Sequence, residues 1–151
     1  MSNFNSVDEI LDFAIGEEEK AADFYTEMAS KMDKQWMKEV FLSFAKEEMG
    51  HKAKLLEVKA GKKLLSVKEK VMDLKIGDYL VDADLNAEMD YQQALIVAMK
   101  KEKAAYKLYN TLAETTDDAN IKEVFLGLAQ EEAKHKLRFE IEYDDKVLRE
   151  N

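Results

Sequence analysis

Apolar residues recur every three or four positions along most of the chain, which is the spacing that places side chains on one face of an α-helix. The pattern predicts four long helices, over about residues 7–32, 34–60, 87–115 and 118–148. Residue types that begin or end helices stand near these limits: Ser6 with Glu9, Asp33, Gly61, and Thr116 or Asp117. We therefore expect an all-α protein.

The second and third predicted helices are joined by residues 61–86, in which residues 66–69 resemble the start of a short helix. A helix of about 27 residues is about 40 Å long, and this connection is long enough to span that length. The third helix can therefore begin at the end where the second began and run parallel to it. The prediction is one domain over residues 1–151, a four-helix bundle of two antiparallel hairpins joined by a long crossover.

The chain contains an internal repeat with a shift of 84 residues, covering 14–55 and 98–139. Residues 33–51 read DKQWMKEVFLSFAKEEMGH, and residues 117–135 read DDANIKEVFLGLAQEEAKH. Identical residues occupy ten of these nineteen positions (D, K, E, V, F, L, A, E, E and H), and no gap is needed. The repeated unit is a helix pair, so the two predicted hairpins are variants of one another.

A glutamate interrupts the middle of each apolar stripe, and in two stripes a histidine follows one turn later. The six residues are Glu18, Glu48, His51, Glu102, Glu132 and His135. Positions i and i+3 share one helix face, so each Glu-x-x-His pair converges on one point. Both histidines of the chain lie in this motif, at equivalent repeat positions.

Four buried carboxylates need compensation, because each ionised carboxylate costs several kcal/mol in a low-dielectric interior and like charges add to the cost. Two divalent cations would balance the four charges. Oxygen and imidazole ligands suit two iron ions, or a manganese–iron or dimanganese pair, with zinc as a substitute. The set matches that of di-iron and di-manganese bundles, in which Glu48 and Glu132 would bridge both metals and the other four residues would complete the two ends.

Tyr25 and Tyr109 lie two turns after Glu18 and Glu102. They are candidates for a hydrogen bond to a ligand carboxylate or for proton donation, and the alternative is a core aromatic with a satisfied hydroxyl. The neighbouring acids are expected in solvent, with orientation of a histidine as an alternative for two of them, Glu47 and Glu131. The full set of these acids is Glu17, Glu19, Glu47 and Glu131.

The composition narrows the function classes. The formal net charge of −9 argues against nucleic acid and anionic membranes as partners. The chain has no cysteine, which excludes disulfides, zinc–thiolate sites and iron–sulfur clusters. No apolar run reaches the length of a membrane span, and the first residues do not read as a signal peptide, so we expect a cytoplasmic protein.

Residues 14–25 (AIGEEEKAADFY) and 44–51 (FAKEEMGH), with their counterparts 98–109 and 128–135, resemble rubrerythrin of the ferritin-like group. The resemblance implies a ferritin-like bundle with a di-iron site that reduces hydrogen peroxide to water, and a homodimer. Two departures matter. Without cysteine there is no rubredoxin-like iron site, so electrons are expected from a separate donor such as a rubredoxin. An extra glutamate of rubrerythrins is replaced by Ala105, with Ala21 at the equivalent repeat position.

The leading hypothesis is a redox enzyme of oxidative stress that reduces hydrogen peroxide or dioxygen at a di-iron centre. One alternative is an iron-binding or ferroxidase protein, because ferritin cages are built from similar bundles. Another is a structural bundle in which the metals act only as a staple.

Overall fold

The computed structural model describes residues 7–61 and 91–148, and it contains the four predicted helices. They are α1 (Val7–Lys31), α2 (Gln35–Ala60), α4 (Tyr91–Thr115) and α5 (Ala119–Glu142), and a short π-helix, η2 (Tyr143–Leu148), follows α5. The predicted crossover beyond Gly61, with its short helix at 66–69, the cap at Ser6 and the start of the third helix at residue 87 all lie outside the described residues. The described part has no strand, in agreement with the predicted all-α class.

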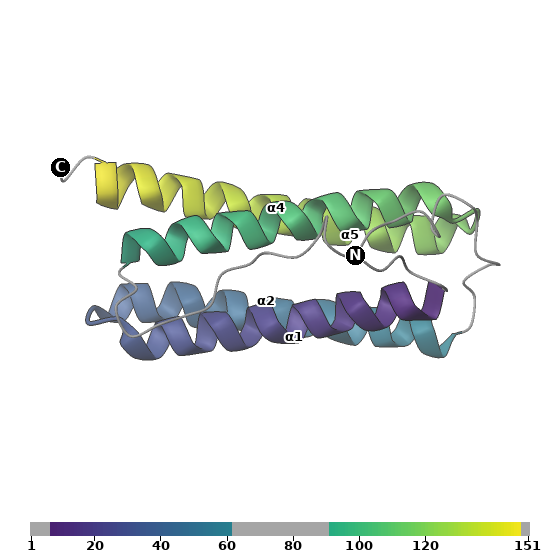
Figure 1. The fold of residues 1–151 in the computed structure, drawn as a ribbon, viewed down its shortest axis with the longest axis horizontal. Coiled ribbons are helices and arrows are strands. Elements are labelled where there is room, and N and C mark those ends of the chain that lie inside the picture. Colours follow the sequence, from purple (N-terminus) through teal and green to yellow (C-terminus); the bar gives the residue numbers. More distant parts are fainter. Residues whose placement is uncertain (1–6, 62–90, 149–151) are drawn as a thin grey trace.

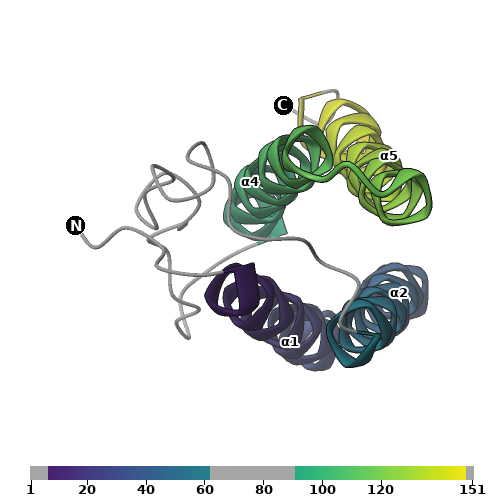
Figure 2. The same ribbon diagram turned by 90° about the vertical axis from the view of Figure 1, so that its right-hand side faces the viewer.

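The helices form two antiparallel hairpins, α1 with α2 and α4 with α5, which pack against each other (Figure 1). Viewed along the bundle, the four helices stand at the corners of a quadrilateral, with α1 facing α4 and α2 facing α5 (Figure 2). Helix α4 starts at the end where α2 starts and runs parallel to it, as the length of the connection predicted (Figure 1). The bundle prediction is therefore confirmed.

Two predicted helix caps are wrong by one or two positions. Helix α2 starts at Gln35, so its N-cap is Lys34, whose side chain makes no capping hydrogen bond, and Asp33 stands one residue too early. The cap of α5 is Asp118, whose carboxylate accepts hydrogen bonds from the backbone N–H groups of the second and third helical residues. Thr116 instead accepts a hydrogen bond from the backbone of Asp118.

The helix ends after α2 and α5 also differ from the sequence pattern. Gly61 ends α2 as predicted, but its φ of −70° is right-handed, so the position does not depend on glycine's freedom to adopt positive φ. The predicted fourth helix continues to residue 148 with a change of winding, because η2 takes over at Tyr143.

The apolar core consists of two clusters separated along the bundle by a layer of acidic side chains. One cluster gathers around Tyr109 and Phe125, with Ile10, Leu11 and Leu55 completely buried in it. The other gathers around Tyr25, Phe41 and Phe139, with Met28 and Leu95 also buried. The four long helices therefore enclose polar residues at mid-length, where a bundle would otherwise be apolar.

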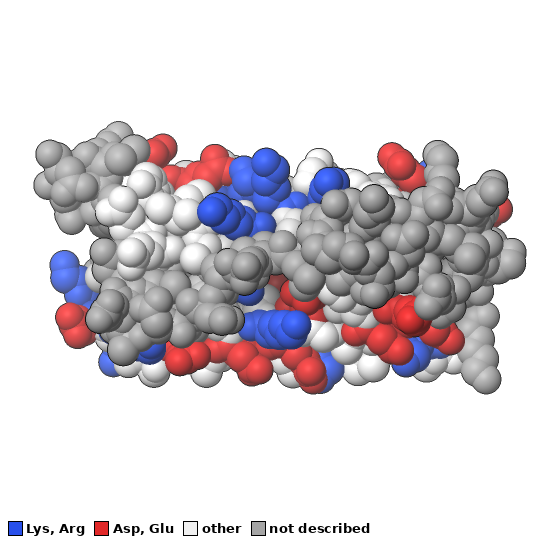
Figure 3. All heavy atoms as spheres, viewed as in Figure 1, with Lys and Arg blue, Asp and Glu red and all other residues white. Residues whose placement is uncertain are grey.

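The described surface carries both signs of charge. On the face drawn in Figure 3, lysine side chains lie among acidic ones, and acidic side chains gather over α1. The exposed acids of α1 are Asp8, Glu9, Asp12, Glu19, Asp23 and Glu27. None of the described helices is both long enough and apolar enough to span a membrane.

Candidate metal centre

The six candidate ligands meet in the acidic layer between the two core clusters, and each is at most 5% exposed. They form two overlapping groups, and within each group one ligand atom per residue lies within 4.8 Å of all the others. Glu48 and Glu132 belong to both groups. Glu18 and His51 complete one group, and Glu102 and His135 complete the other. The geometry is that of two adjacent ion sites with two shared carboxylates.

The histidines connect the two hairpins, because each points its Nδ1 atom at a carboxylate of the opposite hairpin. His51 of α2 places Nδ1 2.6 Å from a carboxylate oxygen of Glu132 on α5. His135 of α5 places Nδ1 3.1 Å from an oxygen of Glu48 on α2. The two rings are nearly parallel, with centroids 5.9 Å apart. The two hairpins therefore contribute equivalent groups to one centre.

The outer ring nitrogen of each histidine contacts a second glutamate, again across the hairpins. His51 Nε2 lies 2.5 Å from a carboxylate oxygen of Glu131, and His135 Nε2 lies 2.5 Å from one of Glu47. A carboxylate at this position accepts the ring N–H, which leaves the Nδ1 lone pair directed inward, where a metal ion would bind. We predicted both glutamates mainly in solvent, with orientation of a histidine as the alternative. Each side chain is about half exposed, and each contacts a histidine, as the alternative predicted.

A sequence signal for these two glutamates existed. Each directly precedes a candidate bridging glutamate, and the Glu-Glu pair occurs in both repeats, at residues 47–48 and 131–132. The periodicity of one helix could not show that these glutamates orient the histidines, because the histidine that each contacts lies on a different helix.

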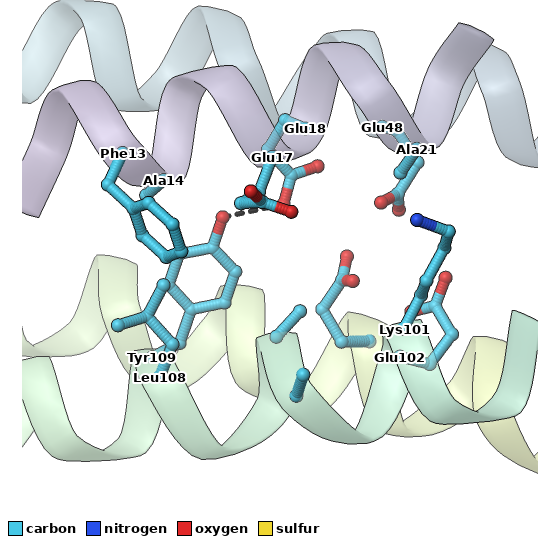
Figure 4. Close-up of a pocket in the computed structure, with 13 residues that line it drawn as sticks. Phe13, Ala14, Glu17, Glu18, Ala21, Glu48, Lys101, Glu102, Leu108 and Tyr109 are labelled. Carbon is cyan, nitrogen blue, oxygen red and sulfur yellow. Dashed lines mark hydrogen bonds between the residues drawn. The ribbon is translucent and has the colours of Figure 1, made fainter. Parts of the chain in front are cut away.

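Both tyrosines donate hydrogen bonds to candidate ligands, and these bonds also cross between hairpins. Tyr25 donates to Glu102 and Tyr109 donates to Glu18, each over 2.5 Å, and Figure 4 shows the second pair. Burial, and then the charges of the surrounding glutamates, raise the pKa of each phenol well above its ordinary value. Both phenols are therefore protonated donors at neutral pH.

The metal-free centre retains protons that these groups would lose in water. Burial, together with the charges of Glu102 and Glu18, raises the pKa of Glu48 to about 8, and the pKa of Glu132 also rises well above its usual range. Burial lowers the pKa of His135, but the nearby carboxylates of Glu102 and Glu48 outweigh it and raise the value to about 11. Positive charge at the centre is therefore strongly favoured.

Divalent cations fit this centre, because the unsatisfied atoms coincide with the candidate ligands. Six buried side-chain nitrogen and oxygen atoms of the described residues lack a hydrogen-bond partner, and each belongs to a different candidate ligand. They are Oε2 of Glu18, Oε1 of Glu48, Nδ1 of His51, Oε2 of Glu102, Oε1 of Glu132 and Nδ1 of His135. Buried polar atoms are rarely left unpaired, so the set indicates missing positive partners.

A small cavity lies between α1 and α4 beside the centre, with a volume of about 30 Å³. Glu18, Glu102 and Tyr109 line it (Figure 4). The small side chains of Ala21 and Ala105 also line it. The volume is enough for a molecule the size of water. The cavity therefore offers a small reactant a place next to the carboxylates.

The stability of the metal-free protein should fall as pH rises from 5 to 8. The folded state keeps a proton on Glu48 up to about pH 8, whereas the unfolded chain releases it near 4.5. His135 extends the effect above pH 6.5 in the same direction. Since the folded state binds more protons in this window, the free energy of unfolding decreases, and we expect the melting temperature to drop by roughly 10 °C.

Thermal melts in the presence of a chelator at several pH values measure this effect. The metal-loaded protein serves as the comparison, because its ligands must lose protons to bind and its stability should increase over the same range. A metal-free protein that becomes more stable toward pH 8 would contradict the prediction.

The comparisons with known proteins agree with this geometry. The model of the rubrerythrin family matches residues 9–143. A Thermotoga maritima protein described as ferritin-like and diiron-carboxylate has a similar solved structure, with a TM-score of 0.79 and 19% identity, over 97% of this chain and 99% of that one. A hypothetical protein from Pyrococcus furiosus gives a TM-score of 0.73 and 26% identity, over 93% and 89% of the two chains. No curated protein matches the sequence.

Proposed function

The chain belongs to the rubrerythrin family, and on this basis we propose that it is a di-metal redox enzyme that reduces hydrogen peroxide or dioxygen with electrons from a separate donor. The ions would be iron or manganese, held by the six buried ligands. The observation that carries the proposal is that all six ligands have an unsatisfied inward-facing atom, next to a cavity the size of a small reactant. A homodimer and a cytoplasmic location remain predictions.

The six ligands would hold two ions, with Glu48 and Glu132 shared between them and one histidine for each. When bound, such a pair supplies redox-active Lewis-acid chemistry that can deliver two electrons to an O–O bond. Glu47 and Glu131 hold the histidine rings in the orientation that directs Nδ1 inward. The protein's contribution is a preset geometry in a site from which bulk water is largely excluded.

Reduction of hydrogen peroxide consumes two electrons and two protons and gives two molecules of water. The electrons would come from the external donor. Tyr109 lines the cavity and donates its hydroxyl hydrogen to Glu18, so it is positioned to donate a hydrogen bond or a proton toward a reactant in the cavity. Tyr25 makes the equivalent hydrogen bond to Glu102. The two phenols therefore keep hydroxyl protons at the centre while the surrounding core stays apolar.

Stopped-flow oxidation of the iron-loaded, reduced protein tests the proposal. Peroxide or dioxygen should oxidise the protein faster than it oxidises the same concentration of free Fe(II). An equal rate would refute a redox enzyme and leave a structural role for the metals. Rapid oxidation by dioxygen followed by release of ferric iron would support the ferroxidase alternative instead.

Filling the cavity should slow the reaction without removing the metals. Ala105→Leu places a larger side chain in the space beside Glu102, at the cost of some overpacking. We expect an unchanged metal content and slower oxidation by peroxide, since each 1.4 kcal/mol added to the barrier means about a tenfold loss of rate. The matched control is Ala53→Leu on the exposed face of α2, which should react like the native protein. A native rate in Ala105→Leu would mean that the reactant arrives by another route.

A further inference from the structure

A row of aromatic rings leads from the surface of α2 to the metal centre. Trp36 contacts Tyr91, with ring centroids 6.3 Å apart, and Tyr91 contacts Phe41 at 6.0 Å. Phe41 stacks on Tyr25 at 6.1 Å, and Tyr25 donates its hydrogen bond to Glu102. Trp36 also lines an open groove between α2 and α5. We call Trp36, Tyr91, Phe41 and Tyr25 the aromatic row.

A second contact joins the same aromatic cluster to the centre. The ring of Phe44 lies 6.2 Å from that of Tyr25 and stacks on the imidazole of His135, with centroids only 4.4 Å apart. Glu102 and His135 complete the same candidate ion site. The aromatic row therefore ends at one of the two ion sites, directly at Glu102 and, through Phe44, at His135.

The internal repeat shows that this row exists at one end of the bundle only. The shift of 84 residues pairs Tyr25 with Tyr109 and Phe41 with Phe125, and these counterparts contact each other at 6.5 Å. The outer members have no aromatic counterpart, because Trp36 pairs with Asn120 and Tyr91 with Val7.

Three further rings around Tyr25 also lack aromatic counterparts: Phe24, Phe44 and Phe139 pair with Leu108, Leu128 and Leu55. The core needs apolar volume at these three positions, but the other end of the bundle fills it with leucines.

Tyr91 has a hydrogen-bond acceptor that could take its proton if the tyrosine were oxidised. Its hydroxyl donates to a carboxylate oxygen of Glu142 over 3.1 Å, and Glu142 is 6% exposed and pairs with Arg138 at 3.2 Å. A phenol gives up its proton when it loses an electron, so a partly buried tyrosine can be oxidised readily only where an acceptor is in contact. Glu142 is such an acceptor.

We propose that the aromatic row conducts single electrons inward, from Trp36 at the surface to the metal centre, when an oxidant has reacted there and the donor has not supplied an electron. This inference rests on the proposed function, with hydrogen peroxide as the oxidant. This electron transfer would leave the oxidised side chain at Trp36, where a soluble reductant can reach it, instead of in the core.

Where the centre holds only one of the two electrons that hydrogen peroxide consumes, Tyr25 supplies the other, and its proton moves along the hydrogen bond to Glu102. Tyr91 returns an electron to Tyr25 through Phe41, which is not itself oxidised, and the Tyr25 proton moves back while that of Tyr91 moves to Glu142. Trp36 then gives an electron to Tyr91, which recovers its proton. The indole radical cation left at Trp36 loses its N–H proton to water, and a one-electron reductant such as ascorbate then restores the electron while water returns the proton.

Pulse radiolysis of the metal-free protein tests conduction without any contribution from the metals. Azide radicals oxidise Trp36, the only tryptophan of the chain, and the absorption bands of indolyl and tyrosyl radicals are then followed. We expect the tryptophan radical to decay as a tyrosyl radical appears, in a first-order phase that does not depend on protein concentration. Tyr91→Phe should lose this phase. Tyr106→Phe, an exposed tyrosine of α4 outside the row, should keep it.

Electron paramagnetic resonance of the trapped radical identifies the inner end of the row. The native protein should show a tyrosyl radical whose oxygen is hydrogen-bonded, and Tyr25→Phe should remove the part of the signal that belongs to Tyr25. A first-order phase that persists in Tyr91→Phe, or a native decay whose rate depends on concentration, would overturn the proposal.

The iron-loaded protein provides a second readout that does not depend on turnover rates. After protein that carries one reducing electron per centre reacts with excess peroxide without a donor, peptide mass spectrometry should find oxygen added to Trp36 in the native chain and in Tyr106→Phe, but not in Tyr91→Phe or in metal-free protein. Consumption of peroxide with Trp36 unmodified would overturn the proposal. If no peroxide is consumed, the proposed function fails, and the metal-free measurement still decides whether the row conducts.

Discussion

The double variant Glu48→Gln/Glu132→Gln should bind almost no metal, and yet its metal-free form should be more stable than the metal-free native protein. The two carboxylates are 1% exposed and belong to both ion sites, so their removal takes away the ligands that the ions would share. The same removal spares the folded state the cost of holding protons on two buried carboxyls that would be ionised in the unfolded chain. Replacement of such carboxyls by neutral groups of similar volume is expected to stabilise the metal-free fold by about 1–4 kcal/mol.

Elemental analysis and thermal melts of metal-free samples measure the two effects. The matched control is Glu39→Gln/Glu123→Gln, which changes exposed glutamates on the same two helices at equivalent repeat positions. It should keep the native metal content and the native melting temperature. A double variant of the buried pair that binds two ions, or one that melts lower than the native metal-free protein, would show that these carboxylates have another purpose.

Metal loading should raise the melting temperature of the native protein substantially. Ligands that bind only the folded state stabilise it by about 4 kcal/mol per site at a free concentration one thousand times the dissociation constant. Two such sites would raise the melting temperature by roughly 15–30 °C in a chain of this size. The shift should be large because the folded chain already gathers the six ligand atoms at the centre, and none of them forms a hydrogen bond.

Calorimetry with Fe(II) under anaerobic conditions, or with Mn(II), measures the shift. The Glu48→Gln/Glu132→Gln variant is the control, and its melting temperature should not respond to either ion. A native protein that melts at the same temperature with and without metal would contradict the assignment of the centre. A shift with Zn(II) alone would keep the site but argue against redox chemistry.

The positions of the six candidate ligands followed from the sequence, because each depends only on the register of one helix. Glu18 falls on the apolar stripe of its own helix whatever the other helices do, and the same holds for Glu102. The repeat then required an equivalent arrangement in each half. The bundle topology was also accessible, since the length of the connection at residues 61–86 limits where the third helix can begin.

The contacts between helices could not be predicted from the sequence in the same way. Tyr25 could be placed near the centre, but its bond to Glu102 of the opposite hairpin depends on how the hairpins are rotated against each other. The roles of Glu47 and Glu131 were left open for the same reason, and the Tyr91–Glu142 bond was not anticipated. The N-caps were misplaced because each three-residue connection contains several polar residues that could act as the cap. The actual cap is the one that directly precedes the first helical residue, and the sequence does not fix where that residue lies.

Each candidate ion site takes ligands from both hairpins. Neither hairpin alone contains a complete site, since each group of four ligands includes Glu48 from one hairpin and Glu132 from the other. All six candidate ligands lie within the two hairpins, and none lies in the connection between them. Two copies of one ancestral hairpin that associated around a twofold axis and bound the ions between them would present the same ligands. The internal repeat is what fusion and divergence of such a pair would leave in one chain.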